Sequence, residues 1–301
     1  MMEHSESMIA SDSLPEVLIS MPREHERQNH PGSCSEYIRQ IVQKPTTSDL
    51  VSSRRAPRPP KTIVQFWHDL NHLPLDVEEC IQTWAAWKSK GFEHHIYEES
   101  TADRFIARSL SPRHKSAFER CYHPAMKSDY FRLCYIFLNG GLYVDADDVC
   151  ITDDLNHLIE DGRLKLQPLC YDVGTAAMVP PQSFLAPEAF DPQWIFYFNN
   201  NPLIAGPGDP VIEYALEQAT LSLGERKVDE FPEIQSATGP GNISRSIFEL
   251  GMNSDYNLES HLAVLGNWDS LAVSKWPLSY RNDARNWRLS NQTRFDSGKQ
   301  V

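Results

Sequence analysis

Positive charge, long apolar runs and paired cysteine motifs are all scarce in this chain. Its 301 residues carry 28 lysines and arginines against 41 aspartates and glutamates, giving a formal net charge of -13. That balance excludes non-specific binding to nucleic acid through a broad basic surface, although it leaves room for a local basic pocket for a diphosphate. The six cysteines form no C-x-x-C pair and no zinc-like cluster with histidines, so we interpret them as buried thiols.

Signals for a membrane or for secretion are also missing. No stretch is long and apolar enough to span a bilayer, and the N-terminus lacks the apolar core of a signal peptide. Glu3 and Glu6 are unlike a transit peptide, which is poor in acid. We therefore expect a cytoplasmic protein with no transmembrane segment, and we leave peripheral membrane association and export as an effector open.

Aromatic side chains are rare in the first 60 residues, where Tyr37 is the only one. The segment is rich in Ser, Pro, Glu and Arg, a composition that buries too little apolar area to offset the entropy lost on ordering. We predict a disordered or targeting tail over residues 1–57, in which only residues 36–43 resemble a short helix. A proline-rich linker then leads to a folded domain over residues 58–301.

The folded domain begins with residues 62–67, a β-branched and aromatic run typical of a buried strand. Residues 76–90 carry apolar side chains three and four positions apart, which predicts a helix with one buried stripe. A second strand is expected at 93–97 and a second helix at 102–110. Because strands and helices alternate, we predict an α/β layer architecture.

The next stretch predicts a helix, a stop and a strand in succession. Pro124 suits the first turn of a helix, and the apolar run after it contains no glycine before Gly140-Gly141. Two glycines can adopt the left-handed conformations that end a helix. Residues 142–144 are then expected to form a short buried strand.

Three carboxylates follow that strand directly, at Asp145, Asp147 and Asp148. Ligands in open α/β sheets bind beyond such strand ends. In an extended chain Asp145 and Asp147 point to the same side, where they repel each other unless a cation lies between them. Mg²⁺ and Mn²⁺ take oxygen ligands and share them with substrate phosphates, so we predict Asp145 and Asp147 as metal ligands. A solvated acidic turn is the alternative for an isolated D-x-D.

Asp129 and Arg132 lie three apart on the predicted helix and hence on one face. Their neighbours are mostly apolar, which predicts partial burial, and buried charges need partners. Such a pair can hold sugar hydroxyls, because the aspartate accepts hydrogen bonds and the arginine donates them. The alternative is an ion pair that only stabilises the helix.

Together these motifs resemble a known family. Ser128-Asp129-x-x-Arg132 followed by GGLYVDAD at 140–147 is similar to the glycosyltransferases with the DXD sugar-binding region. These include initiating α-1,6-mannosyltransferases, capsular polysaccharide transferases and, more distantly, the clostridial glucosylating toxins. Further similarity lies at 60–67, 200–210 and 238–240, so the resemblance covers about residues 59–245.

The resemblance implies a GT-A fold, a Rossmann-like domain that binds a nucleotide-sugar, with Mn²⁺ or Mg²⁺ as cofactor. It implies a hexosyltransferase that takes a UDP- or GDP-sugar and transfers the hexose with retention of configuration, as in polysaccharide biosynthesis. A glycan, a lipid-linked sugar or a protein would be the acceptor.

The resemblance also implies roles for particular residues. Trp67 would lie against the nucleobase, and Asp129 and Arg132 would hold the donor sugar. Asp145 would contact the ribose, or the metal through water, and Asp147 would ligate the metal. These are the residues that we expect to bind the cofactors and to carry catalysis.

Two features near the nucleotide complete the resemblance. Many members of the family have a histidine where this chain has Val64, which puts the contacts near the base in question but not the metal site. A late tryptophan, Trp276 or Trp287, would close over the donor, with core packing as the alternative for each.

Two other kinds of protein remain to be considered. Residues 144–149 also resemble the nucleophile strand of haloacid-dehalogenase phosphatases, in which Asp145 would attack phosphorus and Asp147 would be the acid. That family needs a later Ser or Thr, a Lys and an acidic pair, for which we find no convincing positions. A non-catalytic carbohydrate-binding protein is the third interpretation, and the intact Asp129 and Arg132 argue against a decayed site.

Overall fold

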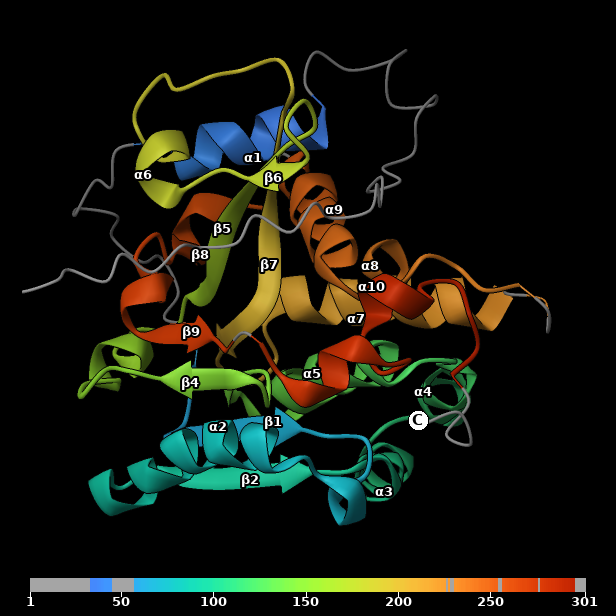
Figure 1. Ribbon diagram of the computed structural model, residues 1–301. Coiled ribbons are helices and arrows are strands. Elements are labelled where there is room, and N and C mark those ends of the chain that lie inside the picture. Colours follow the sequence, from blue (N-terminus) through green and yellow to red (C-terminus); the bar gives the residue numbers. More distant parts are fainter. Residues whose placement is uncertain are drawn as a thin grey trace, which may run out of the picture.

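A mixed seven-stranded sheet runs through the centre of the molecule (Figure 1). The computed structural model describes residues 33–44, 57–225, 227, 230–253, 256–275 and 277–295. The strand order is β2-β1-β3-β7-β5-β6, with β8 beside β5. β1 pairs in parallel with β2 and β3, and β3 pairs antiparallel with β7. The strands are β1 (Thr62–Phe66), β2 (Glu93–Tyr97), β3 (Gly141–Tyr143), β5 (Leu164–Asp172), β6 (Ala177–Met178), β7 (Trp194–Ala205) and β8 (Leu262–Val264).

A separate two-stranded ribbon lies in front of the sheet in Figure 1. It pairs β4 (Asp148–Cys150) with β9 (Ala272–Ser274) in antiparallel register. The ribbon joins the residues just after the acidic motif to a segment more than 120 positions later in the sequence. The C-terminal part of the chain is thereby held beside the carboxylates.

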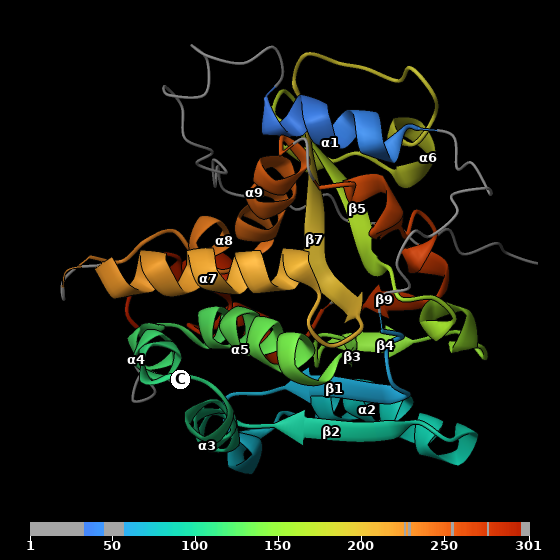
Figure 2. The ribbon, with the colours of Figure 1, turned by 180° about the vertical axis from the view of Figure 1, so that it is seen from behind.

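Helices cover both faces of the sheet. α2 lies on the face that carries the β4–β9 ribbon, and α5 and α7 lie on the other (Figures 1 and 2). The helices are α1 (Cys34–Val42), α2 (Leu75–Ala85), α3 (Glu99–Ser109), α4 (Pro112–Arg120), α5 (Pro124–Asn139), α6 (Pro181–Phe184), α7 (Pro210–Glu225), α8 (Ile234–Ala237), α9 (Pro240–Gly251) and α10 (Trp287–Ser290). Short 3₁₀ turns fall at Leu70–His72, Ala86–Lys90, Asn156–Ile159, Leu258–Ser260, Trp268–Ser270 and Ser279–Asn282.

The two faces of the central strands belong to different hydrophobic clusters. Ile63 and Leu142 pack with Trp84 of α2, whereas Val64 and Tyr143 pack in the cluster that includes α5 and α7. Successive strand residues point to opposite faces, so every residue of β1 is buried. This explains why residues 62–67 do not alternate between apolar and polar side chains, and why the one amide among them, that of Gln65, is also buried.

Two glycines make the turn from α5 into β3. Gly140 and Gly141 have φ angles of 67° and 114°, in the region that favours glycine. A Cβ on Gly140 would lie 2.8 Å from the backbone nitrogen of Pro207, and one on Gly141 would lie 2.8 Å from the carbonyl oxygen of Thr62. The helix therefore ends against the sheet without side chains, which brings α5 close to β3.

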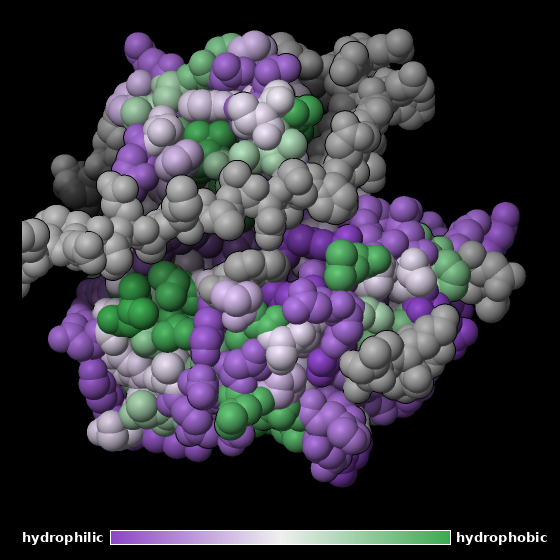
Figure 3. All heavy atoms as spheres, in the orientation of Figure 1, coloured by the Kyte–Doolittle hydropathy of each residue, from purple (hydrophilic) through white to green (hydrophobic). Residues whose placement is uncertain are grey.

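These elements confirm the α/β layer architecture predicted from the sequence. β2 has the predicted limits 93–97, and β1, α2, α3, α5 and β3 differ from the predictions by only a few residues at their ends. The described residues contain no helix long and apolar enough to cross a membrane. On the face shown in Figure 3, apolar side chains form small patches among polar ones.

The N-terminal segment differs from the predicted tail in one respect. α1 forms where residues 36–43 resemble a helix, but it packs into the main hydrophobic cluster, and Ile38 is fully buried. The Cys34 thiol donates to the carbonyl oxygen of Ser244, and the Gln43 amide donates to the carbonyl oxygens of Phe184 and Ala189. The prediction was wrong here for a physical reason. Tyr37, Ile38, Ile41 and Val42 lie on one helix face, and packing that face against the domain offsets the polar composition of the segment. The rest of residues 1–57 lies almost wholly outside the described residues, and the boundary at residue 58 stays a prediction.

Candidate functional site

A cleft of about 450 Å³ opens where β1 and β3 end. α5 supplies one wall, and the turn from β3 into β4 supplies the floor. β7 and the segment from residue 280 to 288 complete it. All five residues singled out from the sequence line this cleft: Trp67, Asp129, Arg132, Asp145 and Asp147.

Arg132 joins two of the carboxylates. Its Nη2 lies 3.1 Å from Oδ1 of Asp129 and 2.8 Å from Oδ1 of Asp145. Nη1 donates to the carbonyl oxygen of Asn200 at 2.9 Å, and the guanidinium lies over the ring of Tyr143 at 4.4 Å. The side chain is 4% exposed. An ion pair that stabilised the helix alone would need only the contact with Asp129, so Arg132 does more than that.

Asp129 is enclosed by groups from two distant segments. Asn200 donates from Nδ2 to its Oδ1 at 2.8 Å, and the Thr238 hydroxyl lies 3.4 Å from its Oδ2. A Cβ on Gly239 would stand 3.1 Å from the same Oδ2, so only glycine fits there easily. Burial raises the pKa of Asp129, while Arg132 opposes this rise. The TGP segment at 238–240 therefore meets the helix pair in space.

The acidic motif forms a turn instead of the extended run expected from the sequence. The amide of Asp148 donates to the carbonyl oxygen of Asp145 at 3.2 Å, which closes a four-residue turn. Gln65 donates to the same carbonyl oxygen at 3.1 Å. The alternation argument for Asp145 and Asp147 is thus wrong in its geometry, although both carboxylates still line the cleft.

The electrostatics of the turn reflect three acids in a small space. Withdrawal from bulk water raises the pKa of Asp145, Arg132 opposes this rise and Asp147 adds to it. Together these effects bring the pKa of Asp145 to about 6. The pKa of Asp148 is also raised, first by burial and then by Asp147 and Asp145. Each carboxylate destabilises the ionised form of its neighbours, an arrangement that a cation would relieve.

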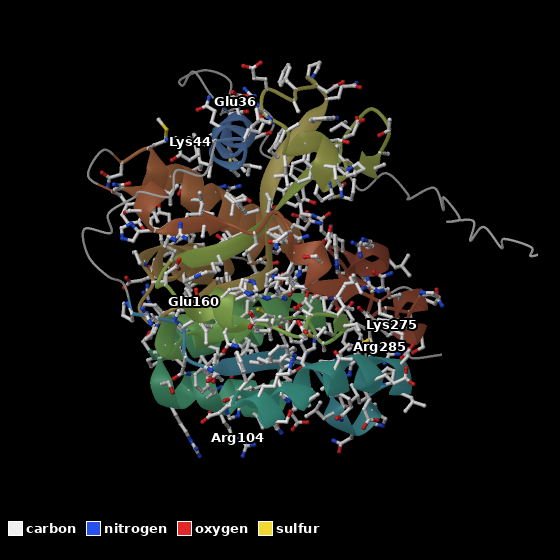
Figure 4. All side chains as sticks on the ribbon, turned by 90° about the vertical axis from the view of Figure 1, so that its left-hand side faces the viewer. Glu36, Lys44, Arg104, Glu160, Lys275 and Arg285 are labelled. Atoms are coloured by element: carbon white, nitrogen blue, oxygen red, sulfur yellow. The ribbon has the colours of Figure 1, made fainter. Side chains whose placement is uncertain are left out.

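Asp147 contacts two residues of the C-terminal segment to which the sequence assigned no role. The Tyr280 hydroxyl donates to Oδ2 of Asp147 at 2.7 Å, and Arg281 forms an ion pair with the same oxygen. The only prediction made for this part of the chain was that Trp276 or Trp287 closes over the donor. Figure 4 labels Lys275 and Arg285, which bracket this segment and lie at one side of the molecule in that view.

The tryptophans behave differently from one another. Trp67 is 8% exposed, packs against Val77 and Ala146, and meets the ring of Tyr280 edge-on with centroids 5.1 Å apart. Its indole Nε1 has no hydrogen-bond partner within the part of the chain that the structure describes. Trp287 lines the cleft and also packs against the main cluster. Trp276 lies outside the described residues.

The residues at the turn suit a divalent cation that is shared with phosphates. Among the described residues, no group of three or more His, Cys, Asp or Glu side chains is arranged as a metal cage. Mg²⁺ does not require such a cage, because it is usually bound through one or two carboxylates together with substrate oxygens. Asp145 and Asp147 supply hard oxygen donors at the edge of this cleft.

Residues 74–164 match the family described as a glycosyltransferase sugar-binding region containing the DXD motif. They include α2 through β4, and hence Asp129, Arg132, Asp145 and Asp147. The chain is thus similar to the DXD-type glycosyltransferases over this region. The motif family predicted from the sequence is thereby confirmed.

Known proteins resemble the sugar-binding region and the wider domain to different extents. The initiation-specific α-1,6-mannosyltransferase of Candida albicans is 30% identical over 95 residues, which is 30% of this chain and 24% of that protein. The match therefore spans about a quarter of that relative. Among solved structures, the PaToxG glycosyltransferase aligns with a TM-score of 0.39 and 17% identity, over 85% of this chain and 90% of that chain.

Several residues that complete the cleft lie outside the sugar-binding region. Asn200 and Asn201 of β7 and Arg281 of the C-terminal segment line the cleft. Thr238, buried in the loop before α9, contacts Asp129 from behind the lining. They contact residues of the sugar-binding region through hydrogen bonds and one ion pair. These residues are 53 to 134 positions away from their partners in the sequence, so local sequence patterns do not predict the contacts.

Proposed function

We propose that this protein is a metal-dependent glycosyltransferase that moves a hexose from a UDP- or GDP-sugar to an acceptor, with retention of configuration. The observation that carries the proposal is Arg132, which links Asp129 to Asp145 on the wall of one cleft. The acceptor class is open between a glycan, a lipid-linked sugar and a protein. A cytoplasmic location stays a prediction.

The donor sugar would lie against Asp129 and Arg132. A hydrogen-bonded carboxylate beside a guanidinium can accept from one sugar hydroxyl and donate to another, which fixes the orientation of the ring. Asn200 and Tyr143 hold the two side chains in place. The anomeric carbon would thus be presented toward the floor of the cleft.

In the reaction, the bond between the anomeric carbon and the diphosphate oxygen breaks, and its electron pair stays on the diphosphate. The acceptor hydroxyl forms the new bond and gives its proton to the departing diphosphate oxygen. A divalent cation held by Asp147 and Asp145, when bound, would supply Lewis-acid stabilisation of the leaving group. Arg281 lies beside Asp147 and can donate to a phosphate oxygen in the same place.

The test is release of nucleotide from a panel of UDP- and GDP-sugars with Mn²⁺ present. We expect release of UDP or GDP with one sugar, suppressed by EDTA and restored by Mn²⁺. Release of inorganic phosphate from phosphomonoesters, without turnover of any nucleotide-sugar, would instead identify a phosphohydrolase. Binding of sugar without any turnover would identify a carbohydrate-binding protein.

A further inference from the structure

Three consecutive asparagines near the end of β7 have unequal surroundings. Asn200 and Asn201 are buried, with 4% and 8% of their surface exposed, whereas Asn199 is only half-buried. Asn199 donates to Oε1 of Gln167 at 3.3 Å, and within the described part of the chain it makes no hydrogen bond to the acidic residues. Because successive strand residues point to opposite faces, Asn200 and Asn201 reach two different parts of the cleft.

Asn200 faces the helix pair. Its Nδ2 donates to Oδ1 of Asp129 at 2.8 Å, and its carbonyl oxygen accepts from Nη1 of Arg132 at 2.9 Å. One residue of β7 therefore holds both members of the pair that we propose for the donor sugar. Among the described residues, Asn200 makes its hydrogen bonds to this pair and none to the acidic turn.

Asn201 faces the acidic turn and spans it from end to end. Its Oδ1 accepts from the backbone amide of Asp145 at 3.0 Å, and its Nδ2 donates to Oδ2 of Asp148 at 2.8 Å. The turn is itself closed by the bond from the Asp148 amide to the Asp145 carbonyl oxygen. Asp147 lies between the two braced residues, so the brace positions its backbone, while Tyr280 and Arg281 contact its carboxylate.

We propose that Asn200 and Asn201 are positioning residues that fix the sugar-holding pair and the metal-binding turn relative to each other. The inference rests on the proposed function, because Asp147 is taken as the metal ligand. Asn201 acts through Asp145 and Asp148, and Asn200 acts through Asp129 and Arg132. Among the described residues, Asn201 is the side-chain donor to Asp148. Removal of this donor destabilises the buried carboxylate, because water does not take its place.

The test compares removal of the brace with its reversal. Asn201→Ala removes both side-chain bonds. The double variant Asn201→Asp with Asp148→Asn exchanges donor and acceptor, keeps the total charge, and leaves an oxygen for the Asp145 amide. Binding of Mn²⁺ alone is followed by the electron paramagnetic resonance of the free ion, and hydrogen exchange is followed in the peptide covering residues 141–150.

We expect Asn201→Ala to weaken Mn²⁺ binding roughly tenfold to a hundredfold and to speed amide exchange at the turn. The reversed pair should restore Mn²⁺ affinity to within about threefold of the natural protein and restore slow exchange. Asn199→Ala is the matched control, with Mn²⁺ affinity unchanged within about twofold. Asn200→Ala should leave Mn²⁺ affinity unchanged and weaken the nucleotide-sugar roughly tenfold.

Two results would overturn the inference. One is slow exchange at the turn in Asn201→Ala, which would show that Asn201 does not brace it. The other is a reversed pair that exchanges slowly and still binds Mn²⁺ as weakly as Asn201→Ala, which would make Asp148 a ligand and Asn201 no intermediary. If the natural protein binds no Mn²⁺, the proposed function fails, while the exchange data still decide whether Asn201 braces the turn.

Discussion

The two halves of the cleft differ in charge and in origin. The half built from α5 and the turn after β3 is one continuous segment, and it contributes Asp129, Asp145, Asp147 and Asp148 with only Arg132 to balance them. The other half comes from β7 and from segments beyond residue 230, and it contributes amides, hydroxyls and three arginines, with Asp269 as its carboxylate. One half therefore concentrates negative charge, and the other makes that concentration tolerable in the folded state.

The contrast implies that the acidic half needs the complete fold. A carboxylate such as Asp148, 3% exposed, meets its partner Asn201 only after β7 has joined the sheet. Before that, the acids are better solvated by water. Segments far from the acidic motif in sequence should thus matter for stability as well as for binding. The largest expected effect is therefore on the stability of the fold.

The first prediction concerns α1, which is the described helix nearest the N-terminus and lies outside the cleft. Ile38→Ala should lower the free energy of unfolding by about 2–5 kcal/mol, because it leaves a cavity in the main cluster. Urea unfolding, with Gln40→Ala on the exposed side of the same helix as control, measures this. This expectation differs from that drawn from composition, which predicts a disordered or targeting tail over residues 1–57. Equal stability of the two variants would mean that α1 is only loosely attached.

The second prediction concerns the acidic half. Asp147→Asn keeps the size of the side chain but removes the charge that attracts a cation, so kcat/KM for the nucleotide-sugar should fall roughly a hundredfold or more. Affinity for the bare nucleoside diphosphate in Mn²⁺ should fall with it. Asp153→Asn, an exposed aspartate outside the cleft, is the control. Full activity of the natural protein in EDTA would remove the proposed role of the turn.

The third prediction separates sugar from metal within the acidic half. Asp129→Asn should weaken the nucleotide-sugar and slow transfer by roughly one to two decades, because a hydrogen bond to a charged group is lost. Affinity for the bare diphosphate should stay nearly unchanged. Circular dichroism must first show that the variant is folded, since Asp129 also pairs with Arg132. Equal loss of diphosphate binding in this variant and in Asp147→Asn would contradict the division of roles.

The same contrast explains how far the sequence could be read. The continuous half was predicted because helix, glycine stop, strand and acids follow one another within 25 residues, and local patterns determine each. Tyr280 and Arg281 were missed because only the β4–β9 pairing brings them to Asp147, and no local pattern encodes a contact across 130 residues. The turn at Asp145 was mistaken for an extended run because its closure depends on Gln65 and Asn201, from two other strands.

The smallest expected effect concerns Trp67, which comes from neither half in sequence but contacts both in space. It follows β1, yet its ring meets Tyr280 of the C-terminal segment edge-on. Alanine at this position would leave a large cavity and confuse binding with stability, so Trp67→Phe is the better variant. Phenylalanine keeps an aromatic ring but loses the indole Nε1, which has no partner among the described residues. If the indole contacts the nucleobase, nucleotide affinity should fall about two- to tenfold with an unchanged metal requirement. Isothermal titration with UDP and with GDP measures this, and unchanged affinity for both in a folded variant would return Trp67 to a purely structural role.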